Sequence, residues 1–187
     1  MTVTPELVSL VDDDGRRLGT AAKDAVHTTS TPLHLAFSCH LFDNQGRTLV
    51  TRRALSKKTW PGVWTNSFCG HPAPDEPLPS AIARRAEQEL GITVSDPESV
   101  LPEFRYRAVD ASGIVENELC PVFYAKYPDG SLPLEPNPLE VCDWAWVRPA
   151  DLEQAAKLAP FAFSPWLVLQ LEQGLYSRTE YPRGVVG

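Results

Sequence analysis

The stretch that decides the fold runs over residues 70–92 and reads GHPAPDEPLPSAIARRAEQELGI. Apolar residues recur in it at i, i+4 and i+8, the spacing of one face of an α-helix, and they are Ile82, Ala86 and Leu90. Pro77 is tolerated near the first turn of such a helix, and Gly91 stands where a glycine commonly ends one. The pattern predicts a helix over residues 77–90.

Around this helix the chain reads mainly as strands. Residues 6–20 predict two strands joined by an Asp-Gly turn. Further strands are predicted over residues 33–43, 47–53, 62–70, 104–109, 114–127 and 140–147, and further helices over 149–158 and 164–174. The proline-rich residues 127–138 predict a loop. Strands with inserted helices indicate a mixed sheet with helices packed on its faces, an α/β or α+β fold.

Composition narrows the class of protein. The 187 residues, 43% of them hydrophobic and 22% charged, suit a single globular domain over residues 1–187. A net charge of −7 disfavours nucleic acid as a partner. We find neither a signal peptide nor a run of about 18 apolar residues that could span a membrane. Four scattered cysteines without a CxxC pair read as reduced thiols, so we expect a cytoplasmic protein.

Two glutamates on one strand are the first candidates for chemistry. Glu116 and Glu118, in the sequence IVENEL, are two residues apart and therefore point to the same face of a strand. They are either an exposed polar face of an edge strand or buried carboxylates that need a cation beside them. In the second case His27, His34 and His71 would complete a His₃Glu₂ site suited to Mn²⁺, Fe²⁺ or Zn²⁺, with Mg²⁺ possible. Spacing alone does not show that the five converge.

Other reactive groups allow several interpretations. Cys69, in SFCGHP, is a nucleophile, a metal ligand, an acid–base group or an ordinary buried thiol. Arg85 and Glu89 fit an i,i+4 ion pair on a solvated helix face. A basic cluster in an acidic chain indicates either an anionic ligand such as a diphosphate or a solvated loop, and it comprises Arg52, Arg53, Lys57 and Lys58. Most aromatic residues near these segments read as core.

Several long motifs together carry a family resemblance. The sequences HLAFSCHLFD, TRRALSKKTWPGVWTNSFCGHP, FRYRAVDASGIVENELCPVF and FSPW resemble the type 1 isopentenyl-diphosphate isomerases of the Nudix superfamily. The likeness runs from about residue 5 to about residue 172. It implies a Nudix-like mixed β-sheet sandwiched between helices, with an extra N-terminal β-hairpin.

The same resemblance accounts for residues 70–92. A Nudix box reads G-x5-E-x7-R-E-U-x-E-E-x-G-U, where U is aliphatic, and the matching residues here are Gly70, Glu76, Arg84, Glu89, Gly91 and Ile92. Arg85 and Gln88 stand where the box has two glutamates, and Ala86 is a small aliphatic substitute. Those glutamates normally help to hold the Mg²⁺ of diphosphate hydrolysis, so their loss, which is usual among the isomerases, puts hydrolysis in doubt.

The resemblance implies a reaction and a set of site residues. The family interconverts isopentenyl diphosphate and dimethylallyl diphosphate through a tertiary carbocation. Cys69, as a thiolate, and Glu118 would be the acid–base groups, Tyr106 would assist Glu118, and Trp166 would face the cation. By analogy, Mn²⁺ or Zn²⁺ would be held by His27, His34, His71, Glu116 and Glu118. A Mg²⁺ ion would be held by Glu89 and the Cys69 carbonyl. The diphosphate would be bound by Lys23, Arg53 and Lys57.

Two other functions are compatible with a Nudix-like chain, a diphosphate hydrolase and an inactive binding module. A Nudix diphosphate hydrolase needs the full set of box carboxylates, and Arg85 and Gln88 argue against it. An inactive Nudix-like binding module has no reason to keep Cys69, Glu118 and three histidines together. We therefore expect a monomeric isomerase acting on a small isoprenoid diphosphate, with neither nucleic acid nor membrane as a partner.

Overall fold

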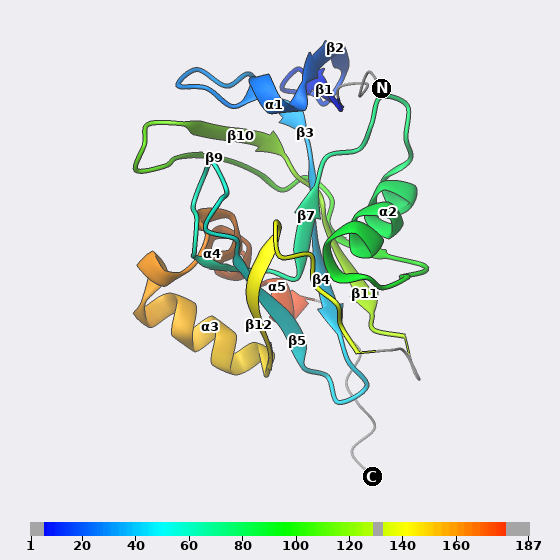
Figure 1. Ribbon diagram of the computed structural model, residues 1–187, viewed down its shortest axis with the longest axis vertical. Helices are drawn as coiled ribbons and strands as arrows, with labels where there is room; N and C mark the ends of the chain where they lie inside the picture. Colours follow the sequence, from blue (N-terminus) through cyan, green and yellow to red (C-terminus); the bar gives the residue numbers. More distant parts are fainter. Residues whose placement is uncertain (1–5, 129–132, 179–187) are drawn as a thin grey trace.

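The structure is a computed structural model that describes residues 6–128 and 133–178. Its strands form two sheets, with the smaller one at the N-terminal end of the molecule (Figure 1). The smaller sheet has the order β2-β1-β3-β10-β9, and its strands are β1 (Leu7–Val11), β2 (Arg17–Ala22), β3 (His34–Leu35), β10 (Val115–Leu119) and β9 (Arg105–Val109). The predicted N-terminal hairpin is therefore present, as β1 and β2.

The larger sheet forms the centre of the molecule. Its main path runs β12-β5-β4-β11-β8, and its strands are β12 (Val141–Val147), β5 (Thr48–Arg53), β4 (Phe37–Phe42), β11 (Val122–Lys126) and β8 (Glu98–Leu101). Two short strands complete it, with β6 (Trp64–Thr65) on β5 and β7 (Phe68–Gly70) on β4. The strand predicted over residues 62–70 is thus two strands, because residues 66–67 turn the chain from one partner to the other.

Two predicted strands each pass from one sheet into the other. The strand expected over residues 33–43 divides at Ala36 into β3 and β4, and the one expected over 114–127 divides into β10 and β11. Pro121 lies at the second break, where its lack of a backbone N–H interrupts the ladder. Both halves remain parallel neighbours, since β10 pairs with β3 and β11 pairs with β4. These two breaks bring the two sheets together at one junction.

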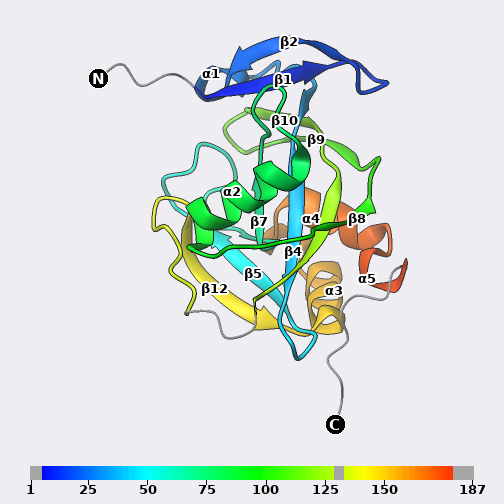
Figure 2. The same cartoon turned by 90° about the vertical axis from the view of Figure 1, so that its right-hand side faces the viewer.

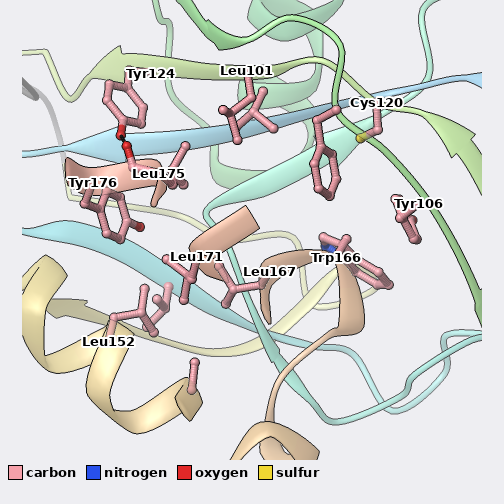
Figure 3. Packing of buried hydrophobic residues seen from close by; sticks show 14 of the residues in the cluster. Leu101, Tyr106, Cys120, Tyr124, Leu152, Trp166, Leu167, Leu171, Leu175 and Tyr176 are labelled. Carbon is pink, nitrogen blue, oxygen red and sulfur yellow. Dashed lines mark hydrogen bonds between the residues drawn. The ribbon is translucent and has the colours of Figure 1, made fainter. Parts of the chain in front are cut away.

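Helices cover both faces of the larger sheet, as the resemblance predicts (Figures 1 and 2). Helix α2 (Leu78–Leu90) packs on one face over a cluster that includes Phe37, Leu41 and Ile82. The other face carries α3 (Pro149–Leu158), α4 (Pro165–Glu172) and α5 (Leu175–Arg178). Figure 3 shows the second cluster, in which Leu167 and Leu171 of α4 meet Leu152 of α3. The remaining helical segments are α1 (Lys23–Val26) and the 3₁₀ turn η1 (Pro160–Ala162).

The helix ends follow the predicted signals closely. Gly91 ends α2 in the left-handed region with a φ of 67°, which a side chain would disfavour. The Ser164 hydroxyl accepts a hydrogen bond from the Leu167 backbone N–H and so caps α4, with Pro165 as its first residue. Helix α3 has the predicted bounds. Part of the loop predicted over residues 127–138 lies outside the described residues. None of the helices in the described part of the chain is long and apolar enough to cross a membrane.

Candidate active site

Strand register places three of the predicted site residues side by side. Glu118 on β10 lies opposite His34 on β3 and opposite Tyr106 on β9. Residues in register on adjacent strands point to the same face of a sheet, so the three side chains converge. The Tyr106 hydroxyl donates to Glu118 Oε2 at 2.9 Å, and His34 Nε2 lies 3.4 Å from Glu118 Oε1.

Two further histidines close over these side chains. His71, directly after β7, places its Nε2 3.0 Å from Glu118 Oε1 and 3.2 Å from His34 Nε2. His27 follows α1 and contributes a third ring, centred 5.1 Å from that of His34. One ligand atom from each of His27, His34, His71 and Glu118 lies within 4.8 Å of the others. The sequence alone did not show this convergence.

Glu116 lies at the margin of this group rather than inside it. Its Oε2 is 3.1 Å from His27 Nε2, and its Oε1 accepts a hydrogen bond from Thr59 Oγ1 at 2.7 Å. Both glutamates are nearly inaccessible, at 7% for Glu116 and 5% for Glu118. Since β10 is an inner strand of its sheet, the interpretation as an exposed edge strand is wrong.

The donor set fits a divalent metal ion. His27 Nε2 is buried and has no hydrogen bond partner among the described residues, although it faces Glu116. His34 Nδ1 bonds the Pro32 carbonyl oxygen at 3.0 Å, so this nitrogen carries a proton and Nε2 is the nitrogen that faces Glu118 and His71. Burial opposes ionisation of Glu118, but His34 and His71 outweigh it and hold the pKa of that carboxyl well below its usual range. Imidazole nitrogens around a carboxylate are ligands that Zn²⁺ and Mn²⁺ accept.

Cys69 lies on β7, beside Ser38 on the neighbouring strand β4. Its Sγ is 3.4 Å from Ser38 Oγ and donates to Asn66 Oδ1 at 3.3 Å. Although part of the residue opens to a cavity, the thiol is surrounded by protein, and this burial raises its pKa to about 12. This burial argues against the thiolate that the resemblance implies, because the hydrogen bond partners of the sulfur are neutral groups that bring no positive charge to it.

One cavity of about 650 Å³ brings the candidate residues together. It is lined by all but one of the predicted site residues, namely Lys23, His27, Arg53, Lys57, Cys69, His71, Glu89, Tyr106, Glu116, Glu118 and Trp166. His34 is fully buried behind this lining and reaches the site through Glu118 and His71. Of the basic cluster, Lys58 also lines the cavity, whereas the Arg52 side chain bonds the Gly62 carbonyl oxygen.

The cations of the cavity have protein partners. Lys23 pairs with Glu6 at 2.5 Å, and Lys57 pairs with Glu140. Arg53 donates from Nε and Nη2 to the Thr59 carbonyl oxygen at 3.2 and 2.9 Å. An anionic ligand would therefore have to compete with carboxylates for both lysines.

The Arg85–Glu89 pair is buried inside the site. Both residues are 7% exposed, so the ion pair is present but its placement on a solvated helix face is wrong. Arg85 Nε donates to Glu89 Oε1 at 3.1 Å, and Arg85 Nη2 also lies 3.5 Å from Glu140 Oε1. A guanidinium therefore occupies the neighbourhood of Glu89, where a Nudix box normally supplies further metal-binding carboxylates.

Trp166 on α4 lines the cavity with its aromatic ring. Its ring centre is 5.7 Å from that of Tyr106, and Figure 3 shows both at one end of the core cluster. The Arg53 guanidinium carbon lies over the same ring, 5.2 Å from its centroid, so the π-face already interacts with a cation.

Several residues that line the cavity or lie directly behind its lining were missed by reasoning from the sequence. Glu6 and Glu140 have no local signal, because each matters only through a lysine that is distant in the chain. Thr59 is close in sequence to the basic cluster, but its hydrogen bond to Glu116 becomes visible only in the tertiary structure. Asn66 did carry a signal, since it is a polar residue three positions before Cys69 in a strand-like segment.

Comparison with known proteins decides the family. Residues 32–167 match the model of the NUDIX domain. The chain is 63% identical to the isopentenyl-diphosphate Delta-isomerase of Clavibacter sepedonicus over 166 residues, 89% of this chain and 86% of that protein. It is 64% identical to the enzyme of the same name from Agromyces mediolanus over 167 residues, 89% and 80% of the two chains.

This chain belongs to the isopentenyl-diphosphate Delta-isomerase family. A third relative of that name, from Leifsonia xyli, is 55% identical over 186 residues, 98% of this chain and 99% of that protein. Among solved structures, a protein from Deinococcus radiodurans matches with a TM-score of 0.67, covering 91% of this chain and 99% of its own. At 20% identity that match supports the Nudix fold alone.

The arginine of the Nudix box, Arg84 on α2, forms contacts that connect the helix to the loop before it. Arg84 forms a two-pronged pair with Glu76, at 2.8 Å from Nε and 2.7 Å from Nη2, and also donates to the His71 carbonyl oxygen at 3.1 Å. Glu76 in turn accepts from the Ala73 backbone N–H. The box arginine therefore holds the loop between β7 and α2, which carries His71, against the helix.

Proposed function

We propose that this protein interconverts isopentenyl diphosphate and dimethylallyl diphosphate. The observation that carries the proposal is that two groups able to exchange a proton, the Cys69 thiol and the Glu118 carboxylate, line one cavity together with cationic side chains. Relatives that are 55–64% identical to this chain are named for this activity, and the match covers most of their length. We therefore assign the chain the isomerase reaction in isoprene biosynthesis.

The reaction needs one group that gives a proton and another that takes one. A proton adds to the terminal carbon of the alkene, positive charge develops at the tertiary carbon, and a proton then leaves from the neighbouring carbon. In the substrate-free protein the thiol of Cys69 holds a proton and Glu118 is ionised, as the directions of their pKa values indicate. An acid and a base are thus ready on the same cavity, and the direction of reaction decides the order in which they act.

Tyr106 and Trp166 assist these two groups. The Tyr106 hydroxyl donates to Glu118 and keeps that carboxylate turned toward the cavity. The π-face of Trp166 would stabilise the tertiary cation by about 2 kcal/mol when water is excluded. In the substrate-free protein Arg53 faces this ring, so a cation is accommodated there.

Divalent metal ions complete the site. We expect Mn²⁺ or Zn²⁺ to be held by His27, His34, His71, Glu116 and Glu118. A Mg²⁺ ion would be held by Glu89 and the Cys69 carbonyl. The ions would supply positive charge that orients the carboxylates and neutralises the diphosphate. Glu89 is paired with Arg85, so an ion bound there would share that carboxylate with the guanidinium.

The substrate is a small isoprenoid diphosphate gripped at its charged end. Lys23, Arg53 and Lys57 line the cavity and would bind the diphosphate oxygens after leaving their present partners. We further propose that the chain works in the cytoplasm as a monomer and a single domain, with neither nucleic acid nor membrane as a partner. These points stay predictions.

Incubation with isopentenyl diphosphate in D₂O tests the function. The metal-loaded protein should form dimethylallyl diphosphate that carries deuterium, and folded Cys69→Ala and Glu118→Gln variants should each lose several orders of magnitude in kcat. Cys142→Ala is the matched control, because Cys142 is exposed and lies outside the cavity lining. Release of phosphate without any isomer would favour the hydrolase and overturn the proposal.

A further inference from the structure

Asn66 is a fully buried amide between β6 and β7 that the proposed reaction has not used. Its Nδ2 donates to the Cys39 carbonyl oxygen at 3.0 Å and to the Phe68 carbonyl oxygen at 2.8 Å. A carbonyl oxygen can only accept, so these two bonds require the nitrogen on that side of the amide. The Asn66 oxygen must therefore face the opposite direction, toward the cavity residues.

The Asn66 oxygen joins two side chains that line the cavity, those of Cys69 and Trp166. Oδ1 accepts from the Cys69 thiol at 3.3 Å and from the Trp166 indole Nε1–H at 3.1 Å. An indole N–H can only donate, so this second contact independently requires an oxygen at the same place. One atom thus links a thiol on β7 to an aromatic ring on α4.

The backbone of Asn66 is held as firmly as its side chain. The Thr51 hydroxyl donates to the Asn66 carbonyl oxygen at 3.0 Å and lies 3.2 Å from that of Ser67. The side-chain oxygen Oδ1, which accepts from Cys69 and Trp166, also accepts from a third donor, Thr65 Oγ1, at 3.0 Å. With both ends of the residue fixed in a closed interior, the oxygen has a single available position.

We propose that Asn66 is a positioning residue for the isomerisation, which sets the placement of the Cys69 sulfur relative to the Trp166 ring. The inference rests on the proposed function, in which the sulfur exchanges a proton with carbon while the ring faces the developing cation. Rotation about the Cβ–Sγ bond turns the S–H away from Oδ1 and into the cavity without moving the sulfur. A reacting group displaced by about 1 Å can lose on the order of 100-fold in rate.

No other side chain of this size meets the same requirements. Aspartate would present oxygens to the Cys39 and Phe68 carbonyl groups and would lose both donors. Alanine would leave those carbonyl groups and the indole N–H of Trp166 without their buried partner. Both changes act on the proton-carrying thiol and the ring, while Lys23 and Lys57 keep their contacts with Glu6 and Glu140.

The test compares Asn66→Ala with Ser67→Ala in the metal-loaded full chain. Ser67 is the matched control because it is equally buried and its hydroxyl bonds Leu49 O and Leu41 N, whereas it forms no hydrogen bond with Cys69 or Trp166. We expect kcat of Asn66→Ala to fall about 100-fold with KM within threefold of wild type. Ser67→Ala should keep kcat within about threefold, since it removes packing and hydrogen bonds only.

A spectroscopic readout separates positioning from general damage. The Trp166 indole ¹H–¹⁵N resonance, assigned with a Trp166→Phe variant, should move upfield in Asn66→Ala because its acceptor is gone, and should stay in place in Ser67→Ala. If Asn66→Ala does not fold, Asn66→Ser carries the same expectations for kcat and for the resonance. A folded variant with kcat within threefold of wild type, or an unchanged resonance, would overturn the role of Asn66 alone. Wild-type protein that forms no dimethylallyl diphosphate would instead overturn the proposed function together with it.

Discussion

At the scale of single residues, the protonation of Cys69 is the feature that the structure changes most. A thiolate needs a positive neighbour, whereas Cys69 contacts the neutral Ser38 and Asn66 and has a pKa of about 12. A thiol with that pKa is about one part in 10⁴ ionised at pH 8. The proton on the sulfur is therefore part of the resting state.

This protonation predicts the alkylation behaviour of the metal-free protein. Iodoacetamide should modify the exposed Cys142 first, while Cys69 reacts slowly at pH 8 and about tenfold faster for each added pH unit up to pH 11. Peptide mapping by mass spectrometry after timed labelling measures both rates. A Cys69 rate that levels off between pH 7 and pH 9 would contradict the raised pKa.

Gly70 offers a second prediction at this scale. A Cβ added there would lie 2.7 Å from Arg85 Cγ and 3.0 Å from the Phe37 ring, closer than side chains tolerate. Gly70→Ala should lower the free energy of unfolding by about 1–3 kcal/mol, which urea denaturation measures. Gly19→Ala is the control, because a Cβ at Gly19 meets nothing within 4 Å. Equal midpoints for the two variants would refute the packing argument.

At the scale of elements, the loop between β7 and α2 depends on one arginine. Arg84 holds Glu76 with two bonds and the His71 carbonyl oxygen with a third, so the helix fixes the backbone of a histidine that we propose as a metal ligand. Outer contacts of this kind orient the side chains that bind the metal. The arginine of the Nudix box is thus a support for the histidine cluster.

Removal of this support should weaken metal binding. Arg84→Gln should raise the Kd for Mn²⁺ or Zn²⁺ about 10-fold or more, because His71 loses its fixed position. Titration calorimetry on metal-stripped protein measures the change. Arg148→Gln serves as control, since Arg148 pairs with Asp151 on the exposed surface of α3. An unchanged Kd in Arg84→Gln would show that His71 is held in place by other contacts.

Elements differ in how far the sequence predicts them. Helices α2, α3 and α4 followed from local signals, because Gly91, Ser164 and Pro165 act within one turn of the chain. The breaks that divide the two long strands did not follow, although Pro121 marks one of them. A strand changes sheets because of the partners it finds elsewhere in the fold, and such partners leave no periodicity of their own.

At the scale of the whole molecule, the site exists only where the two sheets meet. The smaller sheet supplies His34, Tyr106 and Glu118, and the larger one supplies Cys69. Residue types predicted which side chains could react, and the resemblance predicted that they meet. The ion pair of Arg85 with Glu89 was predicted from its spacing, but its burial inside the cavity was not, since burial depends on everything packed around α2.

The global stability of the protein should fall in acid partly because of His40. This histidine is fully buried, bonds Tyr176 and Gln170 through its two ring nitrogens, and has its pKa lowered by burial to about 4. In the unfolded chain its pKa returns to about 6.5, so the unfolded state binds the extra proton between these values. Stability from this group is therefore complete above pH 6.5 and is lost as pH falls toward 4.

A substitution isolates this contribution from those of the other titrating groups. His40→Gln keeps a side chain that donates and accepts but does not titrate, so the pH dependence of unfolding should become shallower. The difference in unfolding free energy between wild type and variant should change by about 2–3 kcal/mol between pH 7.5 and pH 4.5. Urea denaturation of the metal-free proteins at both pH values measures it. Parallel pH profiles for the two proteins would mean that His40 stays accessible to protons in the folded state, against its complete burial between β4 and α4.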